Sequence, residues 1–168
     1  MHVARHFENL SVLHENTLPP RAYYVPDSTT AAYDMVDREQ SERFQLLNGW
    51  WRFRYYPSVR NVPRFWDEAD EWAAFDDIRV PGTWQFQGYD SHQYTNIRYP
   101  IPLDPPHVPH DNPAGAYVTE FAYQSDPAAP TCTLTFEGVD SCFYAWLNGT
   151  YVGYSQVSHA TAEFDVTG

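Results

Sequence analysis

Short segments in which apolar side chains run together or alternate with polar ones follow one another through the second half of the chain. They read AYVTEFAY, TCTLTFEG, SCFYAWLNG, TYVGYSQ and AEFDVTG, and each is bounded by Gly, Pro, Asp or Asn. Short strands at such regular spacing predict an antiparallel β-sandwich or barrel. In the second segment Cys132, Leu134 and Phe136 point to one side and the threonines to the other, so we expect one buried face.

Two Asn-Gly pairs predict hairpins, because a type I′ turn needs a positive φ at both central positions. The first pair, Asn48-Gly49, divides FQLLNGWWRFRYYP, and the second, Asn148-Gly149, divides FYAWLNGTYVGY. After the first pair Trp51, Phe53 and Tyr55 alternate with arginines. This alternation predicts a strand with one buried face.

The two ends of the chain depart from this pattern. Residues 1–42 are polar and irregular, and LPPRAYYVPDSTTAAYD within them predicts an extended arm that wraps the surface and is pinned by its aromatic side chains. Residues 43–168 form the predicted sandwich, in which RFWDEADEWAAF supplies one or two helical turns and DIRVP a short strand. The chain ends on the turn residue of FDVTG, so we expect the sandwich to lack its last strand or strands.

The stretch from Tyr94 to Tyr117 holds six of the 14 prolines, so it can form neither a helix nor an inner strand of a sheet. Within it, Asn96 is flanked by Tyr94 and Tyr99. A side-chain amide offers two donors and an acceptor to sugar hydroxyls, and an aromatic ring can stack on the apolar face of a pyranose. The residues alone leave two hypotheses open, a carbohydrate contact and a structural loop.

Composition narrows the choice of function. The formal charge is -12, and all ten basic residues are arginines, which argues against nucleic acid because phosphate binding needs a basic stripe. The N-terminal residues lack the apolar run of a signal peptide, and we expect a cytoplasmic, soluble protein. Cys132 and Cys142 are then expected to be buried free thiols, with a disulfide as the alternative.

Three clusters could carry chemistry, and each also has a simpler interpretation. The HVPHD segment at residues 107–111 offers two imidazoles and a carboxylate, but Pro109 prevents the helical face on which they would bind a metal together. The acidic residues within 67–71 predict a solvated face rather than a carboxylate pair for glycoside hydrolysis. The sequon at Asn148 is explained by the hairpin turn. No nucleophile elbow, phosphate loop or zinc-type cysteine pair is present.

The order and spacing of several motifs resemble the N-terminal sugar-binding domain of glycoside hydrolase family 2 β-galactosidases. The motifs are LNGWWRF, VPGTWQFQGYD, YTNIRYPI, DPPHVPHDNPAGAY, FEGVDSCFYAWLNGTYVGYSQ and EFDVTG. The resemblance covers essentially the whole chain, and ENLSVLHENTLPPRAYYVP is similar to the leader that precedes this domain. The β-glucuronidases and β-mannosidases of the family share the sandwich and the LNG hairpin, but lack the YTN and NP.G.Y motifs.

The resemblance implies a jelly-roll β-sandwich that packs against a separate (β/α)8 barrel. In that barrel two glutamates would hydrolyse terminal β-D-galactosides of the lactose type by a retaining mechanism, so no catalytic residue is expected in this chain. The proline-rich stretch would reach over the mouth of the barrel, and Asn96 would contact the galactosyl group. Tyr94 and Tyr99 are weaker candidates for the same substrate.

The same resemblance implies magnesium and sodium in the parent enzyme, which we expect to be a homo-oligomer. The sodium site would depend on an aspartate beyond Gly168. A structural magnesium would match Gln156, Asn9 and the backbone of Val12, but His6 stands where an aspartate is expected. Two alternatives remain at this stage, a freestanding carbohydrate-binding module and the corresponding domain of a β-glucuronidase.

Overall fold

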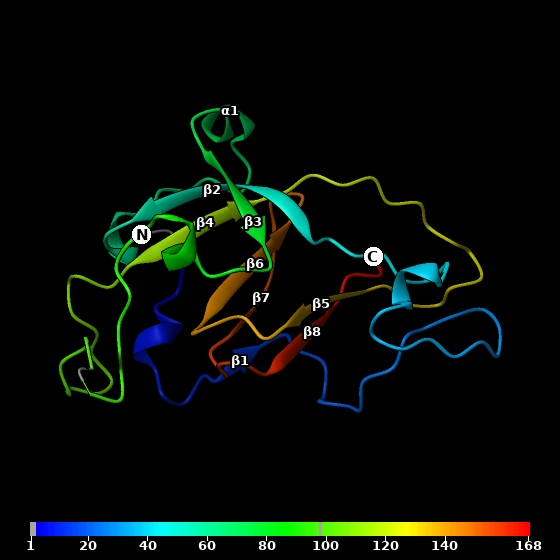
Figure 1. Ribbon diagram of the computed structural model, residues 1–168, viewed down its shortest axis with the longest axis horizontal. Coiled ribbons are helices and arrows are strands. Elements are labelled where there is room, and N and C mark those ends of the chain that lie inside the picture. Colours follow the sequence, from blue (N-terminus) through cyan, green and yellow to red (C-terminus); the bar gives the residue numbers. More distant parts are fainter. Residues whose placement is uncertain (1–2, 98) are drawn as a thin grey trace.

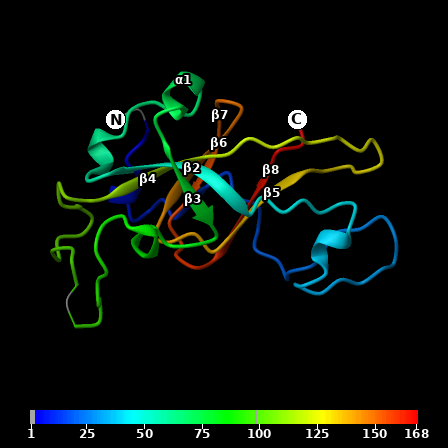
Figure 2. The ribbon, with the colours of Figure 1, turned by 45° about the horizontal axis from the view of Figure 1, so that its top comes forward.

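The computed structural model describes residues 3–97 and 99–168 and is built largely from antiparallel strands. The strands form three sheets with the orders β1-β7-β6, β3-β2-β4 and β5-β8. Figure 1 shows the β3-β2-β4 sheet lying across the other two, with α1 beyond it, and Figure 2 shows the same layering after a turn of 45°. The prediction of an all-β sandwich is confirmed.

The elements are short throughout. The strands are β1 (His14–Glu15), β2 (Gly49–Tyr56), β3 (Asp76–Val80), β4 (Ala114–Val118), β5 (Thr133–Glu137), β6 (Phe143–Leu147), β7 (Thr150–Ser155) and β8 (Thr161–Asp165). The helical turns are α1 (Ala69–Trp72) and the 3₁₀ turns η1 (His6–Glu8), η2 (Arg38–Gln40), η3 (Val59–Asn61) and η4 (Trp84–Gln87). The single α-helical turn before β3 agrees with the sequence prediction.

The second predicted hairpin is confirmed. Strands β6 and β7 pair antiparallel, with Leu147 opposite Thr150. Between them Asn148 has φ 50° and Gly149 φ 77°. Both values lie in the left-handed region that a type I′ turn requires.

The first predicted hairpin is wrong. Residues 44–48 form no strand, and β2 begins at Gly49. Both edges of β2 are occupied by distant strands, since Gly49 pairs with Val80 of β3 and Tyr56 pairs with Ala114 of β4. The strand with one buried face that was predicted after Gly49 is confirmed, because Phe53 is fully buried and the arginines beside it are exposed.

Aromatic clusters fill the space between and around the sheets. On β5, β6 and β8, Phe136 lies 4.6 Å from Phe143 and 6.0 Å from Phe164 between ring centroids. Before α1, Trp66 stacks on Trp146 of β6 with ring centroids 4.2 Å apart and planes 8° apart. The segment between β2 and β3 is therefore packed against β6.

The leader, residues 3–42, contributes to the sandwich. Its strand β1 pairs with β7 through His14 and Glu15, and the backbone N–H of Leu18 donates to the carbonyl of Glu163 on β8 at 2.8 Å. Further along, Arg38 donates to Glu137 at 2.7 Å. The leader is held by backbone pairing and arginines more than by the predicted aromatic pins, since the Tyr23 and Tyr24 side chains are about half exposed.

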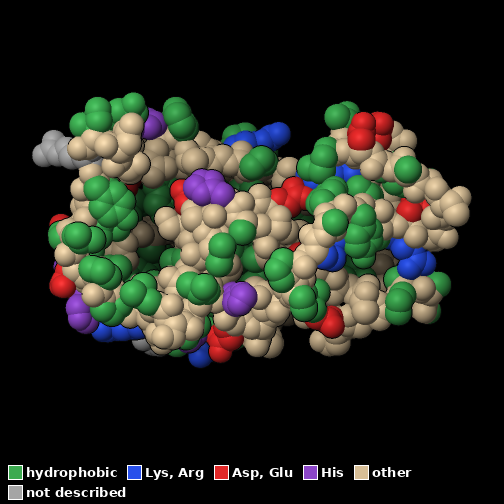
Figure 3. Space-filling model, turned by 90° about the horizontal axis from the view of Figure 1, so that it is seen from below, with side chains coloured by type: hydrophobic (Ala, Val, Ile, Leu, Met, Phe, Trp, Pro, Cys, Tyr) green, Lys and Arg blue, Asp and Glu red, His purple; other side chains and the backbone are tan. Residues whose placement is uncertain are grey.

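The proline-rich arm, defined here as residues 94–113, extends away from the sheets at one end of the molecule in Figures 1 and 2. In the space-filling view of Figure 3, apolar side chains are spread over that same end. Within the described residues, no helix has the length and apolar character needed to cross a bilayer.

Candidate functional site

The tip of the arm presents the residues predicted to contact sugar. Tyr94 and Tyr99 are each 67% exposed, and Asn96 is also exposed. The backbone N–H of Ile97 donates to the carbonyl of Tyr94 at 3.1 Å, so Asn96 lies within a tight turn. Arg98 of the same motif lies outside the described residues. The tip therefore offers one amide and two aromatic faces to a neighbouring molecule or domain.

The chain enters the arm through a rigid aromatic root. Tyr89 packs edge-on against Phe53 at 4.7 Å and donates its hydroxyl to Asp76 at 2.9 Å. Its backbone N–H donates to the carbonyl of Trp84 at 3.1 Å. Trp84 and Tyr89 both belong to the sequence motif VPGTWQFQGYD, but the sequence alone assigned neither of them a role.

The chain leaves the arm on β4, where Gly115 permits close packing. A Cβ atom at this position would lie 2.6 Å from Phe53 and 2.8 Å from Trp84. Tyr117 on the same strand packs 4.7 Å from Phe53, and burial raises its pKa to about 12. Glycine is required here because any side chain would displace the aromatic root.

The residues predicted to hold a structural magnesium are brought together, and they are joined to one another by hydrogen bonds. Gln156 follows β7, and its Nε2 donates to the carbonyls of Val12, Asn9 (3.1 Å) and His6 (3.5 Å). The amide nitrogen therefore lies where the three carbonyl oxygens converge. The Asn9 side chain instead accepts from the N–H of Ser11 at 3.0 Å.

The donor set also lacks the carboxylate that Mg²⁺ prefers. The His6 imidazole, at the position where an aspartate was expected, points to Glu15 with Nε2 and Oε2 3.1 Å apart. Across residues 3–97 and 99–168, no group of three or more His, Cys, Asp or Glu side chains could hold a metal ion. These hydrogen bonds hold the start of the leader against the end of β7. The magnesium and sodium of the parent stay predictions.

Comparison with known proteins identifies the family. The model of the sugar-binding domain of glycosyl hydrolases family 2 matches residues 44–168, which is more than half of the chain. The chain belongs to this family. The jelly-roll sandwich expected from the sequence motifs is the fold of this domain.

Curated relatives of this family 2 chain are similar along most of its length. A β-galactosidase of Actinobacillus pleuropneumoniae is 44% identical over 99% of the chain, and one of Staphylococcus xylosus is 42% identical over 95%. A β-galactosidase of Yersinia enterocolitica is 48% identical over 76%. The matched regions make up 16%, 16% and 12% of these relatives, so the chain spans less than a fifth of their length. Further domains in a parent protein are therefore implied.

The other clusters considered from the sequence are solvated in this family 2 domain. The side chains of His110 and Asp111 are 73% and 99% exposed, and His110 Nδ1 lies 3.8 Å from Asp111 Oδ1. Arg64 pairs with Asp67, donating from Nε to Oδ1 at 2.8 Å, and this pairing holds the pKa of Asp67 below its usual value. Among the described acidic residues of this segment the predicted solvated face is observed.

Cys132 and Cys142 are free, as predicted, but each is half buried rather than fully buried. Burial raises the pKa of the Cys142 thiol, so it stays protonated and unreactive near neutral pH.

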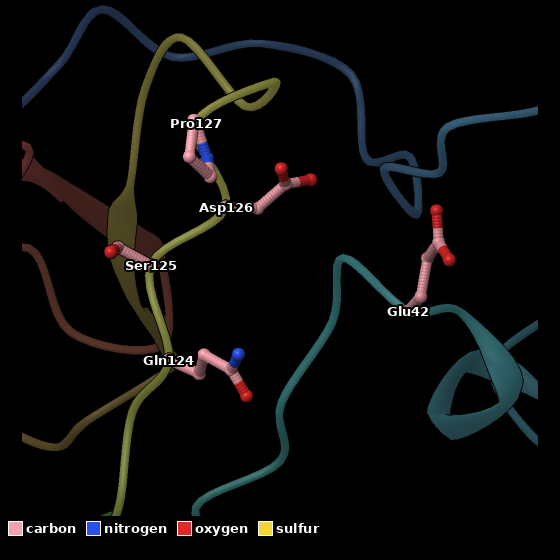
Figure 4. Close-up of a pocket in the computed structure, with 5 residues that line it drawn as sticks. All are labelled: Glu42, Gln124, Ser125, Asp126 and Pro127. Atoms are coloured by element: carbon pink, nitrogen blue, oxygen red, sulfur yellow. The ribbon is translucent and has the colours of Figure 1, made fainter.

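A shallow polar hollow lies between the leader and the loop that follows β4. Figure 4 shows Glu42 on one side of it and the segment from Gln124 to Pro127 on the other, with the Ser125 side chain pointing away from Glu42. Arg43 closes part of this hollow by pairing with Asp126 at 2.9 Å. Two of its polar groups serve contacts within the chain, since Glu42 accepts from Ser28 and Asp126 accepts from the N–H of Ala128 at 2.8 Å.

Proposed function

We propose that the chain is the sugar-binding domain of a β-galactosidase and supplies a substrate contact, Asn96, to a catalytic domain elsewhere in the same protein. The observation that carries this proposal is the arm itself. It is exposed, turned at Asn96 and braced at its root by packed aromatics. The relatives named β-galactosidase support the substrate class.

In this proposal the two glutamates of a retaining mechanism lie in the parent's barrel, outside the 168 residues. This chain positions the substrate. The Asn96 amide donates to and accepts from the galactosyl hydroxyls, and the side chains of Tyr94 and Tyr99 restrict the orientation of the sugar ring. The soluble parent assembles as a cytoplasmic homo-oligomer. Any magnesium and sodium of the parent would be held largely by residues beyond this chain.

The test is Asn96→Ala in the full-length protein, with Asn48→Ala as the control, because Asn48 is also an exposed asparagine but lies outside the arm. Loss of the amide's hydrogen bonds should lower kcat/KM on a chromogenic β-galactoside by about 5- to 150-fold, or about 1 to 3 kcal/mol. The melting temperature should change by only about a degree or two. If kcat/KM stays within about twofold and the melting temperature falls by many degrees, Asn96 is a structural loop residue.

Two further measurements in that experiment separate the alternatives. The 168-residue chain alone should give no turnover, and its affinity for galactose should be weaker than about 1 mM. Saturable binding in the micromolar range would favour a freestanding carbohydrate-binding module. Preference of the full-length protein for a β-glucuronide over a β-galactoside would favour a β-glucuronidase.

A further inference from the structure

The arm makes few contacts with the rest of the molecule along most of its length. Within the described part of residues 93–107, hydrogen bonds are local: Gln93 bonds Ser91, Ile97 bonds Tyr94, Asp104 bonds Pro102 and His107 bonds Asp104. Almost all of these residues are exposed. The path of this segment is therefore set by the points at which its two ends are attached, together with the stiffness that its prolines impose.

The exit of the arm is attached at Val108. There the ion pair of Glu8 and Arg60 hydrogen-bonds to both the backbone N–H and the backbone carbonyl of this residue. The N–H of Val108 donates to Glu8 Oε1 at 3.4 Å, and Arg60 Nη2 donates to the Val108 carbonyl at 3.5 Å. The same Arg60 nitrogen lies 3.3 Å from Glu8 Oε1. The Glu8 side chain is only 12% exposed, so water and salt screen this cluster less than a surface ion pair.

A second attachment follows four residues later, at Asn112. It involves η3, the 3₁₀ turn that contains Arg60. The N–H of Val59 donates to the carbonyl of Asn112 at 2.7 Å. The buried Ser58 caps the turn by accepting from the N–H of Arg60 at 3.3 Å. Exposure changes at this point as well, because Val108 and Pro109 are half buried whereas the residues just before them are exposed.

We propose that Glu8 and Arg60 are positioning residues that fix the exit of the arm and thereby place Asn96 for its substrate. Glu8 belongs to the leader and lies 100 residues before Val108, so the leader supports the sugar contact through the arm. Prolines at 100, 102, 105 and 106 transmit the position of the exit toward the tip, because they restrict the bending of the segment between Val108 and Asn96. The substrate part of this inference rests on the proposed function.

Hydrogen exchange measured by mass spectrometry on the full-length protein tests the attachment without any reference to turnover. Glu8→Ala should accelerate exchange in peptides covering residues 99–113 by about tenfold, as expected when a hydrogen bond to a charged group is lost. Glu8→Gln keeps an acceptor for the Val108 N–H and should restore much of the protection. Arg60→Met approaches the cluster from its other side and should match Glu8→Ala. The control is Asp77→Ala, which removes the exposed Arg52–Asp77 pair.

A double-mutant cycle on kcat/KM then tests whether the attachment acts through Asn96. Glu8→Ala should lower kcat/KM by about tenfold in the wild-type background and by less than about twofold in the Asn96→Ala background, since coupled residues are not additive. Equal losses in both backgrounds would overturn the positioning role. Unchanged exchange in both Glu8→Ala and Arg60→Met would overturn the attachment itself. If Asn96→Ala alone left kcat/KM unchanged while Glu8→Ala accelerated exchange, the proposed function would be overturned and the attachment upheld.

Discussion

The leader and the arm are both irregular, yet they relate to the sandwich in opposite ways. The start of the leader makes many hydrogen bonds to the sandwich. Strand β1 pairs with β7, the Tyr144 hydroxyl donates to the carbonyl of Ala4 at 2.7 Å, and the Gln156 amide donates to three leader carbonyls. Within its described residues, the arm is attached at its root and its exit and leaves its aromatics in solvent. Irregular backbone thus serves as structure where its polar groups are paired, and as a binding surface where its side chains are free.

Matched tyrosines give the strongest test of this comparison. Tyr154 is fully buried and packs 5.1 Å from His6 of the leader and 4.6 Å from Tyr144, whereas Tyr99 of the arm is 67% exposed. Tyr154→Ala should lower the free energy of unfolding by about 3 to 5 kcal/mol, as for large aromatic truncations in a core. Tyr99→Ala should change it by about 0.5 kcal/mol or less. Urea denaturation of the two variants measures both values, and similar losses would abolish the distinction between the segments.

Matched glutamines give the next test. Gln156→Ala leaves leader carbonyls without their donor, which should cost about 1 to 3 kcal/mol of unfolding free energy. Gln93 bonds only Ser91 in its own segment, so Gln93→Ala should be nearly neutral. If magnesium rather than the amide held the leader, adding a chelator to the wild type would reproduce the effect of Gln156→Ala; we expect the chelator to leave this domain's stability unchanged.

The sequence predicted what local patterns specify. The alternation in β2, the strands from β5 to β8 and the Asn148-Gly149 turn each depend on residues a few positions apart. The first Asn-Gly pair misled because the partners of β2 come from β3 and β4, and no local signal shows that both edges are occupied. Strand β1 has two residues, which is too short for any periodicity to be read.

The candidate site divides in the same way. Asn96 and its tyrosines could be proposed from a local motif and the density of prolines. The groups that hold the arm and the leader could not, because Glu8 meets Val108 across 100 residues and Gln156 meets Asn9 across 147. In the sequence Glu8 and Gln156 are ordinary polar side chains of a kind that many surface residues share, so nothing local distinguishes them.

The smallest expected effect concerns a single hydroxyl at the leader. Tyr151 donates to Glu15 at 2.7 Å, and this bond, with a weaker contribution from His6, holds the pKa of Glu15 below its ordinary value of 4.5. A depressed folded-state pKa stabilises the fold above the unfolded pKa, and that stability is lost as the pH falls through the folded value. Because the Glu15 side chain is 42% exposed, Tyr151→Phe should cost only about 0.5 kcal/mol at pH 7. The difference from wild type should shrink as the pH falls through the folded-state pKa of Glu15. Urea denaturation at pH 7 and in acid measures it, and a cost that persisted unchanged in acid would mean that Tyr151 acts through packing rather than through the Glu15 carboxylate.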